Sequence, residues 1–232
     1  LPERIFDSLK RKSRSCFDFF LSTHFVFKHL IRGCSPPYTL MSQLSPTVND
    51  EVTLDPGSLP VNYPVDLVGG GTFNVNPLLA NNILKSEYYQ QLSTCDFDQC
   101  IMKARSNVKN VEPFIVGRHP TPSTAFCILY RLFHLNVTIE QLMSLLNAKE
   151  NPFVRAMACL FVRYACNPQH YWFWLGKYIN DDQSFSPFVK SNPMTMGQYI
   201  CSLLSEPYKY QDTVLPRIPV AIQKTLDGTI SQ

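Results

Sequence analysis

The stretch NPFVRAMACLFVRYACNPQHYWFW, from Asn151 to Trp174, indicates the fold most directly. Its apolar side chains recur at spacings of three and four residues, and an Asn-Pro pair stands at 151–152 and again at 167–168. Asparagine caps a helix and proline fits the first helical position, so each pair marks a helix start. We therefore expect one amphipathic helix over residues 151–164 and another over residues 168–179.

Similar start signals and apolar spacings continue on both sides of this stretch. A threonine followed three residues later by glutamine, the capping-box pattern, occurs at 138–141 and at 195–198. The periodicity predicts five more helices, over residues 77–84, 97–108, 123–135, 138–146 and 195–204. No segment alternates with period 2 beside a hairpin turn, so strands are not expected. The predicted fold is all-α, a compact bundle of about seven short helices.

The composition changes on the N-terminal side of this bundle. Residues 33–72 contain six prolines, five glycines and no lysine or arginine, and neither a helical nor a strand period runs through them. Such a composition is typical of a flexible linker. We therefore expect an N-terminal extension over residues 1–32, a proline/glycine-rich linker over residues 33–72 and a helical domain over residues 73–232.

Charge and hydropathy limit the classes of partner. Residues 75–232 contain fourteen Lys or Arg and eleven Asp or Glu, and the cations are scattered, whereas a nucleic-acid-binding domain usually has a dense basic stripe. RNA contact is therefore expected to be secondary. The apolar run over residues 16–31 is shorter than the about 20 residues that a spanning helix needs and contains Asp18 and Lys28, so no membrane association is expected.

The cysteines and histidines do not form a recognisable catalytic or metal-binding pattern. Cys127 or Cys159 could act as a nucleophile with His134 or His170, but these cysteines lie in apolar helical runs, where thiols are unreactive. The best candidate zinc ligands are Cys159, Cys166 and His170, and their spacing matches no standard zinc motif. We therefore expect no catalytic residue, no cofactor and no metal site.

The four consecutive aromatic residues from Tyr171 to Trp174 suggest a contact surface. Successive residues of a helix lie about 100° apart, so the four side chains cannot all enter one core. Tyr171 aligns with the apolar stripe through Leu175, so at least one of Trp172, Phe173 and Trp174 faces a second helix or a partner. Tyr171, Trp172 and Trp174 are predicted to bind a partner, because Tyr and Trp are frequent interface anchors. The alternative is that a neighbouring helix of the same domain covers them.

Three charged residues complete the predicted partner-binding set. Arg155 and Arg163 are eight residues apart, hence nearly on one face of their helix. That face is either solvated or turned inward, in which case an arginine would pair with Glu112 of the VEPF segment. The prolines of VEPFIVGRHPTP (residues 111–122) exclude a helix there and predict an ordered loop.

Six segments in this order resemble the pre-mRNA-splicing factor 38 family, and within it the B-type branch. They cover nearly all of residues 73–227. The segments are FNVNPLLANNILKSEYY (73–89), VEPFIVG (111–117), STAFCILYRLFHL (123–135), the 151–174 stretch, TMGQYICSLL (195–204) and LPRIPVAIQKTL (215–226).

The resemblance implies an α-helical, non-enzymatic protein of the nucleus. It would join the precatalytic spliceosome and support its activation as a scaffold for other spliceosomal proteins, among them a long helical protein and a zinc-finger protein. The alternative from the residues is a helical RNA-binding module that uses the aromatic helix and scattered cations. A hydrolase or metalloenzyme is the third functional hypothesis.

Overall fold

The computed structural model describes residues 55–118 and 120–230. The expected N-terminal extension, and the expected linker as far as residue 54, lie outside this range. In chain order the α-helices are α2 (Pro77–Lys85), α3 (Glu87–Leu92), α4 (Phe97–Asn107), α5 (Thr124–Phe133), α6 (Ile139–Leu146), α7 (Pro152–Ala165), α8 (Tyr171–Leu175), α9 (Met196–Leu204) and α10 (Val220–Ile230).

The remaining elements are short. Four single turns of 3-10 helix are η1 (Pro56–Ser58), η2 (Gly70–Thr72), η3 (Pro168–His170) and η4 (Gly176–Tyr178). Two antiparallel hairpins pair β1 (Ser184–Phe185) with β2 (Met194–Thr195) and β3 (Lys209–Tyr210) with β4 (Thr213–Val214). The fold class is all-α, as predicted. The hairpins were not expected, because strands of two residues are too short to show an alternating pattern.

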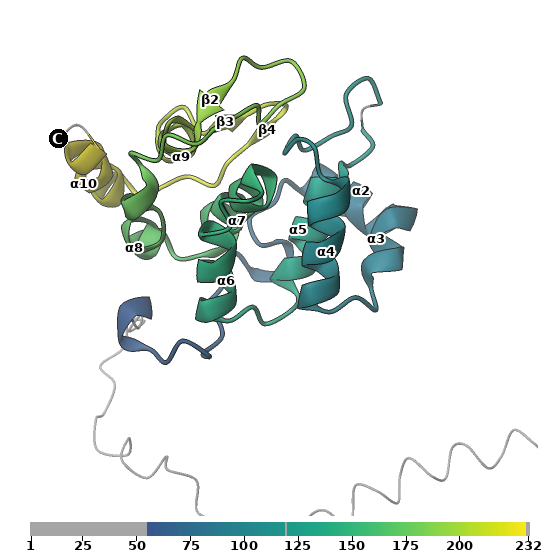
Figure 1. Cartoon of the computed structure of the whole chain (residues 1–232), viewed down its shortest axis with the longest axis horizontal. Helices are drawn as coiled ribbons and strands as arrows, with labels where there is room; N and C mark the ends of the chain where they lie inside the picture. Colours follow the sequence, from purple (N-terminus) through teal and green to yellow (C-terminus); the bar gives the residue numbers. More distant parts are fainter. Residues whose placement is uncertain (1–54, 119, 231–232) are drawn as a thin grey trace, which may run out of the picture. The chain divides into compact units, whose positions relative to one another are not determined.

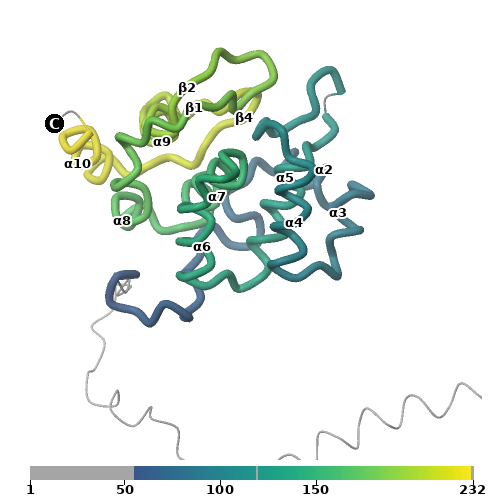
Figure 2. Tube along the Cα trace, viewed as in Figure 1, coloured from purple at the N-terminus to yellow at the C-terminus, as the bar shows by residue number. Residues whose placement is uncertain are grey.

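Helix α7 forms the centre of the domain (Figures 1 and 2). It contacts α4, α5, α6, α8 and α9, and twelve of its fourteen residues are buried. A helix that is covered on all sides has to be apolar around most of its circumference, which explains its dense run of apolar residues. Asn151 caps it by accepting hydrogen bonds from the amides of Phe153 and Val154, both at 3.1 Å.

Helices form in each of the seven predicted places. The two capping boxes are present at Thr138 and Thr195. The helix expected over residues 168–179 is divided into η3, α8 and η4. Helices α3 and α10 were not predicted: α3 has only six residues and no side-chain cap, and α10 follows the prolines at 216 and 219 and contains Gly228.

Residues 55–72 pack on the domain and do not behave as the flexible linker expected there. The Val65 amide donates to the Val137 carbonyl at 2.8 Å, and the Val68 amide donates to the Ala165 carbonyl at 2.7 Å. Pro56 and Val65 are buried. The expected domain start at Phe73 is therefore too late for the part of the chain that the structure describes. The sequence did not show this packing, because the segment pairs through backbone groups and therefore needs no periodic pattern of side chains.

Among the helices that the structure describes, none is long and apolar enough to cross a bilayer.

Candidate functional site

Two of the three aromatic residues predicted to bind a partner lie in the core. Tyr171 and Trp174 are each 1% exposed. The Tyr171 hydroxyl donates to the Arg163 carbonyl at 2.9 Å and accepts from Nη1 of Arg163 at 3.2 Å. The domain itself covers these two residues, which was the alternative interpretation of the aromatic run.

The cover over Trp174 comes from the segment that precedes Phe73. Pro56, Leu59 and Val65 line a residual cavity of about 10 Å³ against the Trp174 ring. Phe173 meets Trp174 edge-on, with ring centroids 5.0 Å apart. The segment that was expected to be a linker therefore packs beside the aromatic helix, on the side of Trp174.

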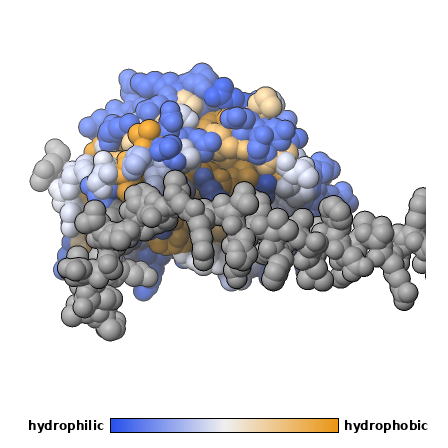
Figure 3. Space-filling model, turned by 90° about the horizontal axis from the view of Figure 1, so that it is seen from below, coloured by the Kyte–Doolittle hydropathy of each residue, from blue (hydrophilic) through white to orange (hydrophobic). Residues whose placement is uncertain are grey.

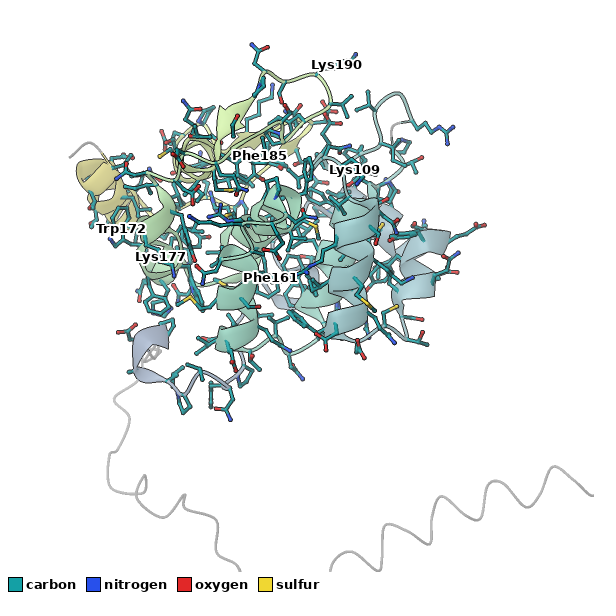
Figure 4. All side chains as sticks on the ribbon, viewed as in Figure 1. Lys109, Phe161, Trp172, Lys177, Phe185 and Lys190 are labelled. Carbon is teal, nitrogen blue, oxygen red and sulfur yellow. The ribbon has the colours of Figure 1, made fainter. Side chains whose placement is uncertain are left out.

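Trp172 is the predicted aromatic anchor that stays accessible. It is 36% exposed, and its ring packs closely on Gly176, where an added Cβ atom would lie 2.7 Å from Cε2 of the ring. Lys177 is exposed, and its Nζ atom lies 4.7 Å from the centroid of the Tyr178 ring. Figure 4 shows Trp172 and Lys177 on the same side of the domain.

Arg155 points inward, but its partner is not Glu112. It is 1% exposed and donates to the Leu146 carbonyl at 2.9 Å, to Oδ2 of Asp181 at 2.7 Å and to Oε1 of Gln183. The hydrogen bond from Arg155 is the main reason that the pKa of the Asp181 carboxyl lies below its ordinary value. Arg155 thus joins α7 to the end of α6 and to the segment after η4.

Arg163 is also inward, and its hydrogen bonds go to uncharged oxygen atoms. It is 0% exposed; Nε donates to the Leu203 carbonyl at 2.8 Å, and Nη2 donates to the Pro216 carbonyl. The Leu203 carbonyl belongs to the last turn of α9, where carbonyls lack helical donors. The rings of Tyr171 and Tyr208 flank the guanidinium, at 5.3 and 5.5 Å. Burial lowers the pKa of Arg163 below its ordinary value.

Glu112 connects two surface loops and does not contact either arginine through a salt bridge. It is 8% exposed, and its Oε1 accepts a hydrogen bond from the Val189 amide at 2.9 Å. The loop over residues 111–122 is ordered in its described part, as predicted: the Ile115 amide donates to the Thr121 carbonyl at 2.9 Å. The six predicted residues therefore occupy three places: the aromatic helix, the α7 interior and the loop at Glu112.

The hydrogen-bond partners of Arg155 and Glu112 were not predicted from the sequence. Asp181 could have been suspected, because two adjacent acidic residues follow η4. Val189 carries no such signal, since only its backbone amide contacts Glu112.

The cysteine thiols considered above have raised pKa values. Burial raises the pKa of Cys127 to about 11 and that of Cys159 to about 12, and it also raises the pKa of Cys166. These thiols are protonated at neutral pH and are poor nucleophiles. Within residues 55–118 and 120–230, no group of three His, Cys, Asp or Glu side chains is placed to hold a metal ion.

The fold and these contacts define a helical domain whose interior polar groups stabilise its own helices and loops. The chain belongs to the PRP38 family, whose model matches residues 69–228. This confirms the resemblance to the splicing factor 38 family.

Curated relatives support the same assignment. Pre-mRNA splicing factor SR-like 1 of Arabidopsis thaliana is 37% identical over 156 residues, which are 67% of this chain and 39% of that protein. Pre-mRNA-splicing factor 38B of Homo sapiens is 31% identical over 184 residues, with 68% of this chain and 33% of that protein covered. The chain thus spans between 33% and 39% of the length of the curated relatives it matches.

A solved structure shares the fold. A chain in the crystal structure of the Snu23-Prp38-MFAP1(217-258) complex of Chaetomium thermophilum superposes with a TM-score of 0.58 at 17% sequence identity. The match covers 71% of this chain and 87% of that chain.

Proposed function

We propose that this chain is a non-enzymatic scaffold component of the spliceosome in the nucleus. It joins the precatalytic complex and supports its activation through protein–protein contacts. One observation carries the proposal: the family match over residues 69–228 lies within the folded domain and includes all its α-helices except the end of α10, and the matched relatives are pre-mRNA-splicing factors. The neighbouring fold comes from a complex with two further proteins, which is consistent with a role in protein assembly. A long helical partner and a zinc-finger partner are what the family resemblance implies for this chain.

The interior chemistry also supports a scaffold. Arg155 and Arg163 are the charged groups most deeply placed in the domain, and both are engaged by carbonyl, carboxylate, amide or hydroxyl oxygens of the domain itself. The buried thiols are protonated at neutral pH. The use of these arginines and thiols in packing supports a role without catalysis.

The second candidate, a helical RNA-binding module, retains one favourable observation. Trp172 is accessible, and the exposed cation Lys177 follows it on the same side of the domain (Figure 4). A ring with a nearby cation can stack a base. With Tyr171 and Trp174 buried, however, the row of stacking rings that such a module would use is reduced to one clearly exposed ring on this helix.

We expect tagged full-length chain to recover splicing proteins from nuclear extract equally well before and after RNase treatment, because a scaffold contacts proteins directly. Quantitative mass spectrometry of the recovered proteins provides the measurement. The double variant Trp172→Ala/Lys177→Ala removes the exposed ring and the cation that follows it, and its affinity for RNA is measured in parallel.

The RNA-binding alternative makes the opposite forecast. RNase would then abolish recovery, and a uridine 20-mer would bind with an affinity that falls steeply with salt and is lost in the double variant.

A further inference from the structure

Three exposed aliphatic side chains gather at one place on the surface. Single apolar residues are normal on protein surfaces. The face seen from below shows hydrophobic areas bordered by hydrophilic residues (Figure 3). Three exposed aliphatic residues are not isolated, because they line one pocket together. They are Ile115, Val116 and Val189, which are 39%, 44% and 57% exposed. We call these three residues the loop patch. They come from the loop over residues 111–122 and from the loop between β1 and β2.

The loop patch is fixed by hydrogen bonds before any partner arrives. The Ile115 amide donates to the Thr121 carbonyl at 2.9 Å, and the Arg118 amide donates to the Ile115 carbonyl at 3.0 Å. The second loop is held to the first by the Val189 amide, which donates to the buried Glu112 carboxylate at 2.9 Å. A preorganised surface loses little entropy on binding, which favours affinity.

Residues of the loop patch line two pockets. One, of about 300 Å³, lies between the end of α4 and the start of α5, and Lys109 lines it. The other, of about 210 Å³, is lined by Lys190 and Asp212. Apolar side chains of a bound segment can therefore rest on the patch while their neighbours reach either pocket.

The exposed charged side chains around the loop patch are mostly positive, with three cations against the single exposed carboxylate of Asp212. Lys109, Arg118 and Lys190 are exposed, and none of them forms a salt bridge with the residues that the structure describes. Figure 4 shows Lys109 and Lys190 toward the same end of the domain. Two carboxylates line the pockets: Asp212 is exposed beside Lys190, and Glu112 is buried and bound to Val189. The pocket beside Lys109 has no acidic lining residue.

We propose that the loop patch docks an acidic peptide segment of a spliceosomal protein. Apolar side chains of the segment contact Ile115, Val116 and Val189, and its carboxylates lie beside Lys109 and Lys190. The aliphatic surface selects apolar side chains, because unpaired bases bind mainly by stacking on aromatic rings. Lys109 and Lys190 favour acidic residues next to those apolar side chains in the bound segment. The inference rests on the proposed function, since that function supplies the partner.

The test selects binders from a display library of random 16-residue peptides on the full chain. We expect enriched peptides to combine Asp or Glu with aliphatic or aromatic residues. Affinities for the best peptide should fall at least about tenfold in Lys109→Glu and in Val116→Ser/Val189→Ser, which is the effect of removing an interface hot spot. Lys177→Glu makes the same charge change away from the patch and should leave the affinity unchanged.

A second pair of variants tests the role of Glu112 in positioning the patch. Glu112→Gln retains an acceptor oxygen for the Val189 amide, whereas Glu112→Ala removes it. The glutamine variant should bind the selected peptide nearly as well as the parent chain, and the alanine variant should bind it more weakly. Circular dichroism of both variants shows whether the domain is folded.

Several results would overturn the inference. These are enriched peptides without acidic residues, recovery of no peptide above background, or affinities that the patch variants leave unchanged. A uridine 20-mer that binds through Lys109 and is indifferent to Val116→Ser/Val189→Ser would make the surface an RNA contact instead. The proposed function is judged separately: if the parent chain and the patch variant both join spliceosomes, the docking site is wrong while the function stands.

Discussion

Replacing Trp174 with alanine should lower the free energy of unfolding by about 3–5 kcal/mol, the usual cost of deleting a buried tryptophan side chain. Trp174 is 1% exposed, and Pro56, Leu59 and Val65 line the small residual cavity beside its ring, so its removal leaves a larger cavity in the core. Denaturant titration of the full chain, followed by far-ultraviolet circular dichroism, gives the measurement.

Trp172→Ala is the matched control, because it removes the same side chain two residues earlier. Trp172 is 36% exposed, so its loss should cost about 1 kcal/mol or less. Equal losses for both tryptophans would mean that the segment before Phe73 does not cover α8. A loss in unfolding free energy for Trp174 together with a loss of partner binding for Trp172 would divide the aromatic helix into a core side and a contact side.

Replacing Arg163 with methionine should lower the free energy of unfolding by about 3 kcal/mol. The variant leaves the Leu203 and Pro216 carbonyls without their donor, and a buried acceptor left unpaired costs about 1–3 kcal/mol. Part of this cost is offset, because the cation no longer has to be buried without a carboxylate partner. The same denaturant titration measures the free energy of unfolding of this variant.

Arg105→Met makes the identical chemical change at the surface. Arg105 forms a salt bridge with Glu150 at 2.9 Å, and the two side chains are 50% and 58% exposed. Exposed pairs contribute about 0–1 kcal/mol, so this control should be nearly neutral. If Arg163→Met were equally neutral, the hydrogen bonds of Arg163 to the end of α9 and to Pro216 would not stabilise the fold.

The helices around α7 could be predicted because their signals are local in the sequence. Asn151 and Thr195 cap the residues that directly follow them, and the apolar spacing of α7 lies within its own fourteen residues. The position of residues 55–72 could not be predicted in this way. That segment binds through backbone groups to residues far along the chain, such as Val137 and Ala165, and its composition resembles a linker.

The site was predicted less well than the fold, because a sequence lists charges without distances. The inward direction of Arg155 was considered with Glu112 as its partner, but the fold places the Asp181 carboxylate 2.7 Å from Arg155 instead. The amide that donates a hydrogen bond to the Glu112 carboxylate lies 77 residues away and belongs to Val189. The loop patch likewise combines residues 115, 116 and 189, and it exists only once the two loops are joined.

Depletion and add-back in splicing extract test the scaffold proposal most directly. Nuclear extract depleted of this protein should assemble pre-mRNA into the precatalytic complex but fail to activate it, and purified full-length chain should restore activation. Native gels of the complexes and analysis of splicing products provide the readout. The Val116→Ser/Val189→Ser variant, added back in parallel, reports separately on the docking site. Normal activation and splicing in the depleted extract, without add-back, would contradict the account.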